Sequence, residues 1–143
     1  MPDSGDQPPA RRVRVPLRVR FGETDAVGVA NNAVYLSWFE VARIEYLRAI
    51  GGDYAALHND GVDLVVSEAG VRYLRPLRFD DPLDLTCWCS ELRTATFAFG
   101  YEVHRHGTLC ATGFTRHACL DRARMAPVRL PAWLAEAIAR PHP

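Results

Sequence analysis

The sequence predicts an α+β domain in which one antiparallel sheet of about five strands curls around a single long helix. Three observations support this prediction. A strand-like stretch comes first, a long and strongly apolar helix follows, and four more strand-like stretches come after it, joined by short links. Short links between successive strands are typical of antiparallel pairing. A single sheet can cover so apolar a helix only by curling around it.

The first strand is predicted at 13–21, where apolar residues alternate with arginine. Pro16 lies within it and has no backbone N–H to donate, so we expect this strand near an edge of the sheet. A loop rich in Gly, Asp and Asn is expected at 22–32. The remaining strands are predicted at 62–75, 83–92, 96–105 and 108–121, with His106 and Gly107 as a two-residue hairpin turn.

The stretch 34–50 is the one strong helix. Twelve of its seventeen residues are apolar, and four of its five polar residues share one narrow stripe. We expect so apolar a helix to be mostly buried against the sheet, and we predict that a second subunit covers part of it, in a homodimer at least. Asn31 or Asn32 is expected to cap its start, and Gly51 and Gly52 to end it. A short helix is expected at 131–139.

The length of 143 residues suits one compact domain. We assign 1–12 to a flexible N-terminal tail, because its first residues include Pro, Asp and Gly and no apolar core, and 13–143 to a single domain. The tail lacks the apolar segment of a signal peptide, and no apolar run approaches the roughly 18 residues of a membrane span. We therefore expect a cytoplasmic protein without a membrane partner.

Charge and cysteine content argue against several functions. The 17 basic and 17 acidic residues give a formal net charge of +0, which does not favour binding to nucleic acid. Every basic residue is arginine, which excludes lysine Schiff bases, P-loops and Ser–Lys dyads. The 4 cysteines form no Cys-x-x-Cys pair, and the histidines lack zinc-finger spacing. We expect structural thiols, no metal and no cofactor.

Asp25 is the strongest candidate for chemistry. It is a carboxylate in a Gly-containing loop just before the long helix. A helix N-terminus carries unpaired N–H groups and a partial positive charge, so it can hold a carboxylate ionised and can bind an oxyanion. The alternative is that Asp25 only satisfies backbone amides of its own loop.

The stretch 25–36, DAVGVANNAVYL, followed by Phe39, Glu40 and Arg43, resembles the 4-hydroxybenzoyl-CoA thioesterase family of hotdog-fold acyl-CoA thioesterases. The stretch 75–83 resembles the link between two strands of that family, a weaker signal on its own. The resemblance implies the hotdog fold, hydrolysis of an acyl or aroyl thioester to a free acid and a thiol, and active sites at the interface of a homodimer or homotetramer. It implies an acyl-CoA substrate, in which coenzyme A is part of the substrate, and an acyl-carrier-protein thioester stays open.

Matched by position, Asp25 is the catalytic carboxylate of the family, as nucleophile or as general base. Asn32 falls where the backbone N–H at the helix start polarises the thioester carbonyl. Gly28, Val29 and Asn31 are expected to contact substrate. Many relatives have His where this chain has Val29, and some have His at the position of Asn32, so neither place offers an imidazole for proton transfer.

Arg43 has two interpretations. It lies off the polar stripe of the helix, which favours a pocket or an interface, and relatives that release polyketide chains have an arginine at the matching place in their site. The alternative is a surface ion pair with Glu40. Two other functions stay open. A dehydratase would need a histidine base near the helix start, and a non-catalytic acyl-binding protein would not need Asp25.

Overall fold

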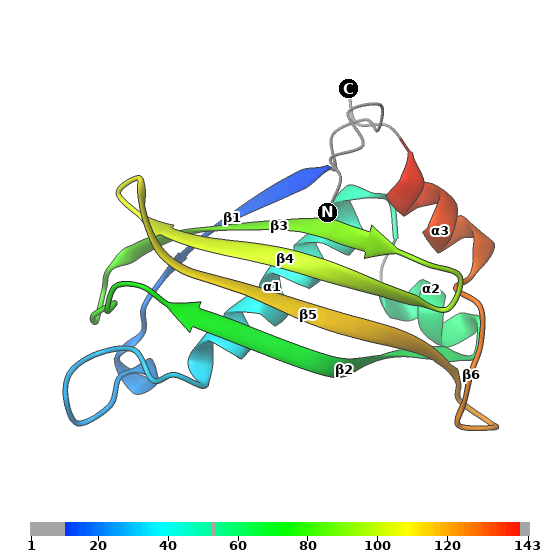
Figure 1. The fold of residues 1–143 in the computed structure, drawn as a ribbon, viewed down its shortest axis with the longest axis horizontal. Helices are drawn as coiled ribbons and strands as arrows, with labels where there is room; N and C mark the ends of the chain where they lie inside the picture. The colour runs from blue at the N-terminus through cyan, green and yellow to red at the C-terminus, as the bar shows by residue number, and fades with distance from the viewer. Residues whose placement is uncertain (1–10, 53, 141–143) are drawn as a thin grey trace.

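The computed structural model describes residues 11–52 and 54–140, and shows a sheet with the strand order β1-β3-β4-β5-β2, with a short β6 paired to β5. All of these pairings are antiparallel, and the sheet curls around helix α1 (Figure 1). The elements are β1 (Arg12–Arg18), η1 (Phe21–Glu23), α1 (Val34–Ala49), α2 (Tyr54–Asn59), β2 (Val62–Tyr73), β3 (Pro82–Leu92), β4 (Thr96–Arg105), β5 (Thr108–Asp121), β6 (Ala126–Pro127) and α3 (Ala132–Ala139). The predicted α+β class and the curled antiparallel sheet around one long helix are confirmed.

Several predicted boundaries are confirmed by their local geometry. β4 and β5 have the predicted bounds, and His106 and Gly107 between them both have positive φ, at 49° and 79°, as a two-residue hairpin turn requires. Gly51, with φ at 89°, ends α1. Its N–H donates to Arg48 O at 3.1 Å, and the N–H of Gly52 donates to Leu47 O at 2.9 Å, the paired bonds of a glycine-terminated helix.

Two predicted strands end earlier than expected. β1 stops at Arg18, because Val19 leaves the ladder and exchanges backbone hydrogen bonds with Asp80 and Asp81. β2 stops at Tyr73, because the next two backbone N–H groups both donate to Cys110 O. The helices η1 and α2 and the strand β6 were not predicted. The predicted tail at 1–12 falls largely outside the described residues, and β1 begins at its last residue.

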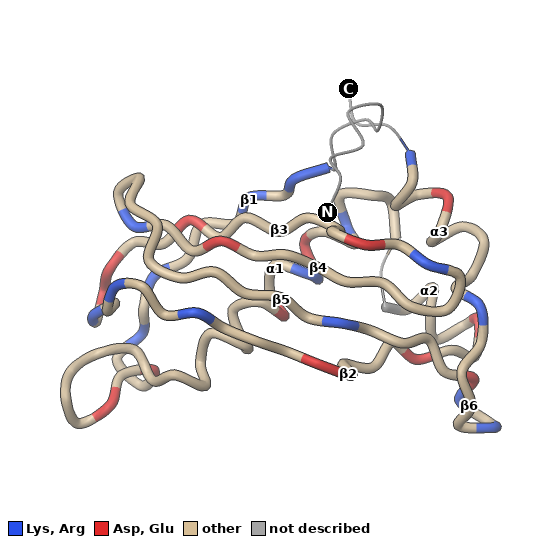
Figure 2. Tube along the Cα trace, viewed as in Figure 1, with Lys and Arg blue, Asp and Glu red and all other residues tan. Residues whose placement is uncertain are grey.

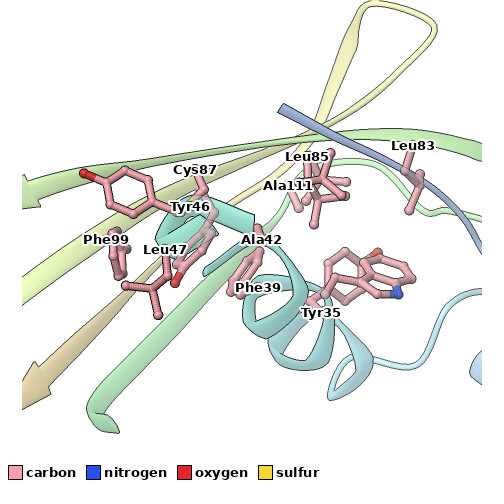
Figure 3. Packing of buried hydrophobic residues seen from close by; sticks show 14 of the residues in the cluster. Tyr35, Phe39, Ala42, Tyr46, Leu47, Leu83, Leu85, Cys87, Phe99 and Ala111 are labelled. Carbon is pink, nitrogen blue, oxygen red and sulfur yellow. The ribbon is translucent and has the colours of Figure 1, made fainter. Parts of the chain in front are cut away.

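The core lies between α1 and the concave face of the sheet (Figure 3). The ring of Phe39 stacks on Tyr101 of β4, with centroids 4.1 Å apart and planes at 6°. On β5, a Cβ at Gly113 would lie 2.4 Å from the ring of Phe39, so only glycine permits this approach. The buried residues of α1 are Tyr35, Trp38, Phe39, Ala42, Arg43, Tyr46 and Leu47. Arg43 is the charged residue in this set.

The two edges of the sheet differ. β1 forms one edge, as its proline predicts, and β2 forms the other. None of the twelve residues of β2 falls in the buried class, all of them being described, whereas β3, β4 and β5 each bury several side chains. Acidic and basic residues both occur along the length of the described trace, so neither sign of charge is confined to one part of it (Figure 2). No helix within the described ranges combines the length and apolar character that a membrane span requires.

Candidate active site

The loop that carries Asp25 is a tight hairpin. The N–H of Asp25 donates to Val29 O at 2.9 Å, and the N–H of Gly28, whose φ is 88°, donates to Asp25 O at 3.0 Å. The carboxylate oxygen Oδ1 accepts the N–H of Val27 at 2.9 Å and the N–H of Val29 at 3.4 Å. The other oxygen, Oδ2, has no hydrogen-bond partner among the described residues, and the side chain is exposed. One carboxylate oxygen thus holds the loop, and the other takes no part in holding it.

Glu23 connects this loop to α1. Its carboxylate is buried, with Oε2 accepting the indole Nε1–H of Trp38 at 3.0 Å and Oε1 accepting the N–H of Arg20 at 2.7 Å. Burial raises the pKa of Glu23, but these hydrogen bonds and the guanidinium of Arg20 outweigh it and hold that pKa below its usual value. The Glu23 carbonyl also accepts the N–H of Asn31 at 2.8 Å. Glu23 therefore fixes both ends of the loop, a role that was not predicted.

The link between β2 and β3 holds the other side of the same loop. The N–H of Ala30 donates to Leu77 O at 2.7 Å, and Val29 forms an antiparallel bridge with Arg78. The Arg78 guanidinium lies beside Gly28, where an added Cβ would be 4.0 Å from its Nη1. The two stretches that resemble the thioesterase family, 25–36 and 75–83, are thus in direct contact.

The start of α1 differs from the prediction. The cap is neither Asn31 nor Asn32 but Ala33, which makes no side-chain capping bond. Asn31 instead uses its Oδ1 to accept the N–H of Ala33 at 3.0 Å, which forms an extra turn before the helix. The Asn32 carbonyl accepts the hydroxyl of Tyr73 at 2.6 Å. Its N–H donates to no acceptor in the described ranges.

Arg43 points into the sheet. The residue is 9% exposed, and its Nη1 donates to the hydroxyl of Tyr101 at 3.2 Å. That hydroxyl shares a hydrogen bond of 2.6 Å with Thr115 Oγ1, which shares another of 2.8 Å with His117 Nε2. Burial, and then the positive charge of Arg43, lower the pKa of His117 to about 4, so its imidazole is neutral at neutral pH. We call these four side chains the buried polar chain.

A groove of about 290 Å³ runs along α1 toward Arg43. The helix residues that line it are spaced so that they share one face. Along α1, the residues that line the groove extend from Leu36 in the first turn to Arg43. Its lining residues are Leu36, Ser37, Glu40 and Arg43 from α1, Val66 and Ala69 from β2, and Thr115 from β5. Of the predicted site residues, Arg43 lies in this groove, while Asp25, Gly28 and Val29 lie in the hairpin loop and Asn31 and Asn32 in the turn before α1.

The histidines, cysteines and carboxylates that the structure describes form no group of three or more that could hold a metal ion. The four cysteines are unpaired thiols, three of them buried. Burial raises the pKa of the Cys87 thiol, which lies in the core beside Arg43 and Cys89, so it is protonated and packs as an apolar group.

Comparison with known proteins identifies the family. The model of the thioesterase-like superfamily matches residues 19–138. The acyl-CoA thioesterase YbgC of Haemophilus influenzae is 33% identical over 117 residues, which are 81% of this chain and 86% of that protein. The 1,4-dihydroxy-2-naphthoyl-CoA hydrolase of Thermosynechococcus vestitus is 34% identical over 125 residues, 83% of this chain and 86% of that protein.

Solved structures agree with the sequence matches. The DHNA-CoA thioesterase of Staphylococcus aureus superposes with a TM-score of 0.80 at 28% identity, covering 83% of this chain and 80% of that one. A hypothetical protein of Thermus thermophilus superposes with a TM-score of 0.83 at 33% identity, covering 87% and 95%. The curled sheet around α1 is the hotdog fold that the resemblance implied. With its fold and nearly all of its domain matched, the chain belongs to the thioesterase-like superfamily.

Proposed function

We propose that this chain hydrolyses acyl or aroyl thioesters of coenzyme A, with Asp25 as its catalytic carboxylate and the turn before α1 as its oxyanion site. Thioester hydrolysis is the activity named for its relatives in Haemophilus influenzae and Thermosynechococcus vestitus. One observation supports the assignment of residues. Asp25 Oδ2 and the Asn32 N–H, both without partners among the described residues, lie on two segments that Glu23 holds together.

The chemistry needs one carboxylate and one donor. Asp25 either attacks the thioester carbonyl and forms a mixed anhydride, or takes a proton from the water that attacks it. In both routes negative charge develops on the carbonyl oxygen. The N–H of Asn32, at the positive end of α1, donates to that oxygen and stabilises the charge. The C–S bond then breaks. In the general-base route the leaving sulfur takes up the proton that Asp25 accepted. In the anhydride route coenzyme A leaves as a thiolate, and water then cleaves the anhydride, which releases the free acid, regenerates Asp25 and supplies the proton for the thiolate. The acyl group occupies the groove along α1.

The other predicted contacts stay predictions. Gly28, Val29 and Asn31 border the carboxylate and the donor, so a thioester placed between these two groups passes close to them. Arg43 lies at the far end of the groove, where it would meet the acyl group rather than the thiol. The chain would act as a cytoplasmic homodimer or tetramer on CoA or carrier-protein thioesters.

The substitution Asp25→Asn tests the function. Asparagine keeps an oxygen for the N–H groups of Val27 and Val29, so the melting temperature should hardly change. It removes the charge that attack or proton abstraction needs, and kcat should fall at least about a hundredfold. Thiol release is measured over straight-chain acyl-CoAs, aryl-CoAs and acyl-carrier-protein thioesters.

Asp80→Asn is the matched control. Asp80 is an exposed aspartate in the neighbouring link, with φ at 65°, a conformation that asparagine tolerates. The kcat of Asp80→Asn for thiol release should equal that of the wild type. A folded Asp25→Asn protein with an unchanged kcat would remove Asp25 from the mechanism. A wild-type protein that binds acyl-CoA but releases no thiol would favour the non-catalytic alternative.

A further inference from the structure

Two cavities meet at Arg43. Its side chain lines the groove and also lines a small inner pocket of about 10 Å³, which has room for about one water molecule at most. The inner pocket is lined mainly by apolar side chains, among them Leu47, Phe97 and Leu134. Arg43 borders both spaces. A second contact also connects the two spaces. Thr115 lines the groove, and His117, to which it is hydrogen-bonded, lines the inner pocket.

The buried polar chain holds this boundary in place. Tyr101, Thr115 and His117 are all buried, and hydrogen bonds of 3.2, 2.6 and 2.8 Å connect them in series with Arg43. Aromatic rings support the chain on two sides. Phe39 stacks on Tyr101, and Phe97 stacks on His117 with centroids 5.0 Å apart. A buried network whose members are connected in this way is rigid, so the guanidinium has a fixed position.

We propose that Arg43, held by the buried polar chain, forms the end wall of the acyl groove and limits the length of the acyl group that the enzyme accepts. This inference rests on the proposed function. The helix rises about 1.5 Å per residue, which puts the Cα of Arg43 roughly 14 Å from that of Val34. Helical side chains lean toward the N-terminus, so the guanidinium shortens the groove further. An acyl group whose carbonyl lies at Asn32 therefore meets a charged wall within this distance.

The wall separates acyl groups by length and by polarity. A short acyl group ends before Arg43 and leaves the guanidinium undisturbed. A long alkyl chain would have to displace the guanidinium, which means breaking its bond to Tyr101 and burying methylene groups against a charge. Behind the wall the surroundings are apolar. Removing the Arg43 side chain would join this space to the groove and create room for additional methylene groups.

Arg43→Ala tests the proposal in the full-length protein. The first readout is kcat/KM over a series of straight-chain acyl-CoAs. The second is the affinity for the corresponding free carboxylic acids, measured by isothermal titration calorimetry without turnover. Each methylene that fits an apolar pocket changes selectivity by about 10–200-fold. For Arg43→Ala, the selectivity ratio, which is the value for a long acyl group divided by the value for a short one, should therefore rise at least about tenfold both in kcat/KM and in acid affinity. Arg43→Lys keeps a long cationic side chain and should restore much of the wild-type ratio.

Two further variants complete the test. Tyr101→Phe removes the hydroxyl that holds Arg43 but keeps the ring, so the ratio should shift in the same direction by a smaller factor. This variant decides the question if Arg43→Ala does not fold. Arg48→Ala is the control, because Arg48 lies on the same helix, is exposed and pairs with Glu45. Its ratio should equal that of the wild type.

The outcomes separate the wall from the proposed function. If the wild type releases thiol but folded Arg43→Ala keeps the wild-type ratio in hydrolysis and in acid binding, the wall is refuted. If the wild type releases no thiol from any substrate, the proposed function fails. The acid affinities then decide alone whether Arg43 limits the groove.

Discussion

Replacing Glu23 by alanine removes the acceptor that joins the Asp25 loop to α1. Trp38 is 3% exposed, so its indole N–H would be left in the interior without a partner, which costs about 1–3 kcal/mol. Losing the hydrogen bond from the N–H of Arg20 costs about 0.5–1.5 kcal/mol more. The ion pair adds little, because the Arg20 side chain is 81% exposed. The free energy of unfolding should therefore fall by about 2–4 kcal/mol.

Urea denaturation followed by tryptophan fluorescence measures this change. Glu23→Gln keeps one acceptor oxygen and should lose about half as much stability as Glu23→Ala. Glu45→Ala is the matched control, because Glu45 also pairs with an arginine three residues away, but its side chain is 40% exposed. Its cost should stay within about 0.5 kcal/mol. The reasoning is refuted if Glu23→Ala costs no more than Glu45→Ala.

The same substitution should affect turnover. The bond from the N–H of Asn31 to the backbone carbonyl of residue 23 stays in this variant. The carboxylate that ties the start of the Asp25 loop to Trp38 of α1 is gone, however, so this connection loosens. A carboxylate and an oxyanion donor that are no longer held together lose their mutual orientation, which enzymes need for a fast reaction. The value of kcat for Glu23→Ala should fall although Asp25 itself is unchanged.

Two further predictions concern pH and assembly. His117 takes up a proton near pH 6.5 in the unfolded chain but only near pH 4 in the folded chain. The free energy of unfolding should therefore decrease as the pH is lowered from about 6.5 to about 4, by roughly 3 kcal/mol at most. Chemical denaturation at a series of pH values should show this slope in the wild type and lack it in His117→Gln. Static light scattering should give at least twice the chain mass of 16.0 kDa, because the described part of the chain buries none of the side chains of β2, and Val66 and Tyr73 on this strand are exposed. A stable folded species of 16.0 kDa at micromolar concentration would contradict it.

The regular elements could be predicted because their signals are local. Alternation along 96–105 and 108–121 and the turn at His106 and Gly107 lie within a few residues of one another. The end of β1 was mispredicted because Val19 takes its backbone partners from Asp80 and Asp81, about sixty residues away. The helix α2 has six residues, too few for a 3.6-residue period to be visible.

The candidate site could be predicted only in its local part. The Asp25 loop was found from its own residues, and its match to a family gave it a role. Glu23 was missed because its partner Trp38 lies 15 residues away, and Tyr101 because its partner Arg43 lies 58 away. No short pattern marks such contacts. Only Thr115 and His117, two apart on a strand, carried a readable signal, since residues at that spacing share one face.

The unlike edges of the sheet limit how copies of this chain can join. β1 offers a proline and a row of arginines, a poor template for another strand. β2 pairs with β5 along one of its edges, and its other edge presents a long row of backbone N–H and C=O groups that no strand of the sheet uses. A strand that pairs antiparallel with its own copy creates a two-fold axis, and both copies use the same edge in doing so. Growth along the hydrogen-bond direction would therefore close at two chains, with a β1 strand at each outer end. Any larger assembly would have to form through the faces of the sheet or through loops, where side chains and not backbone groups determine the fit.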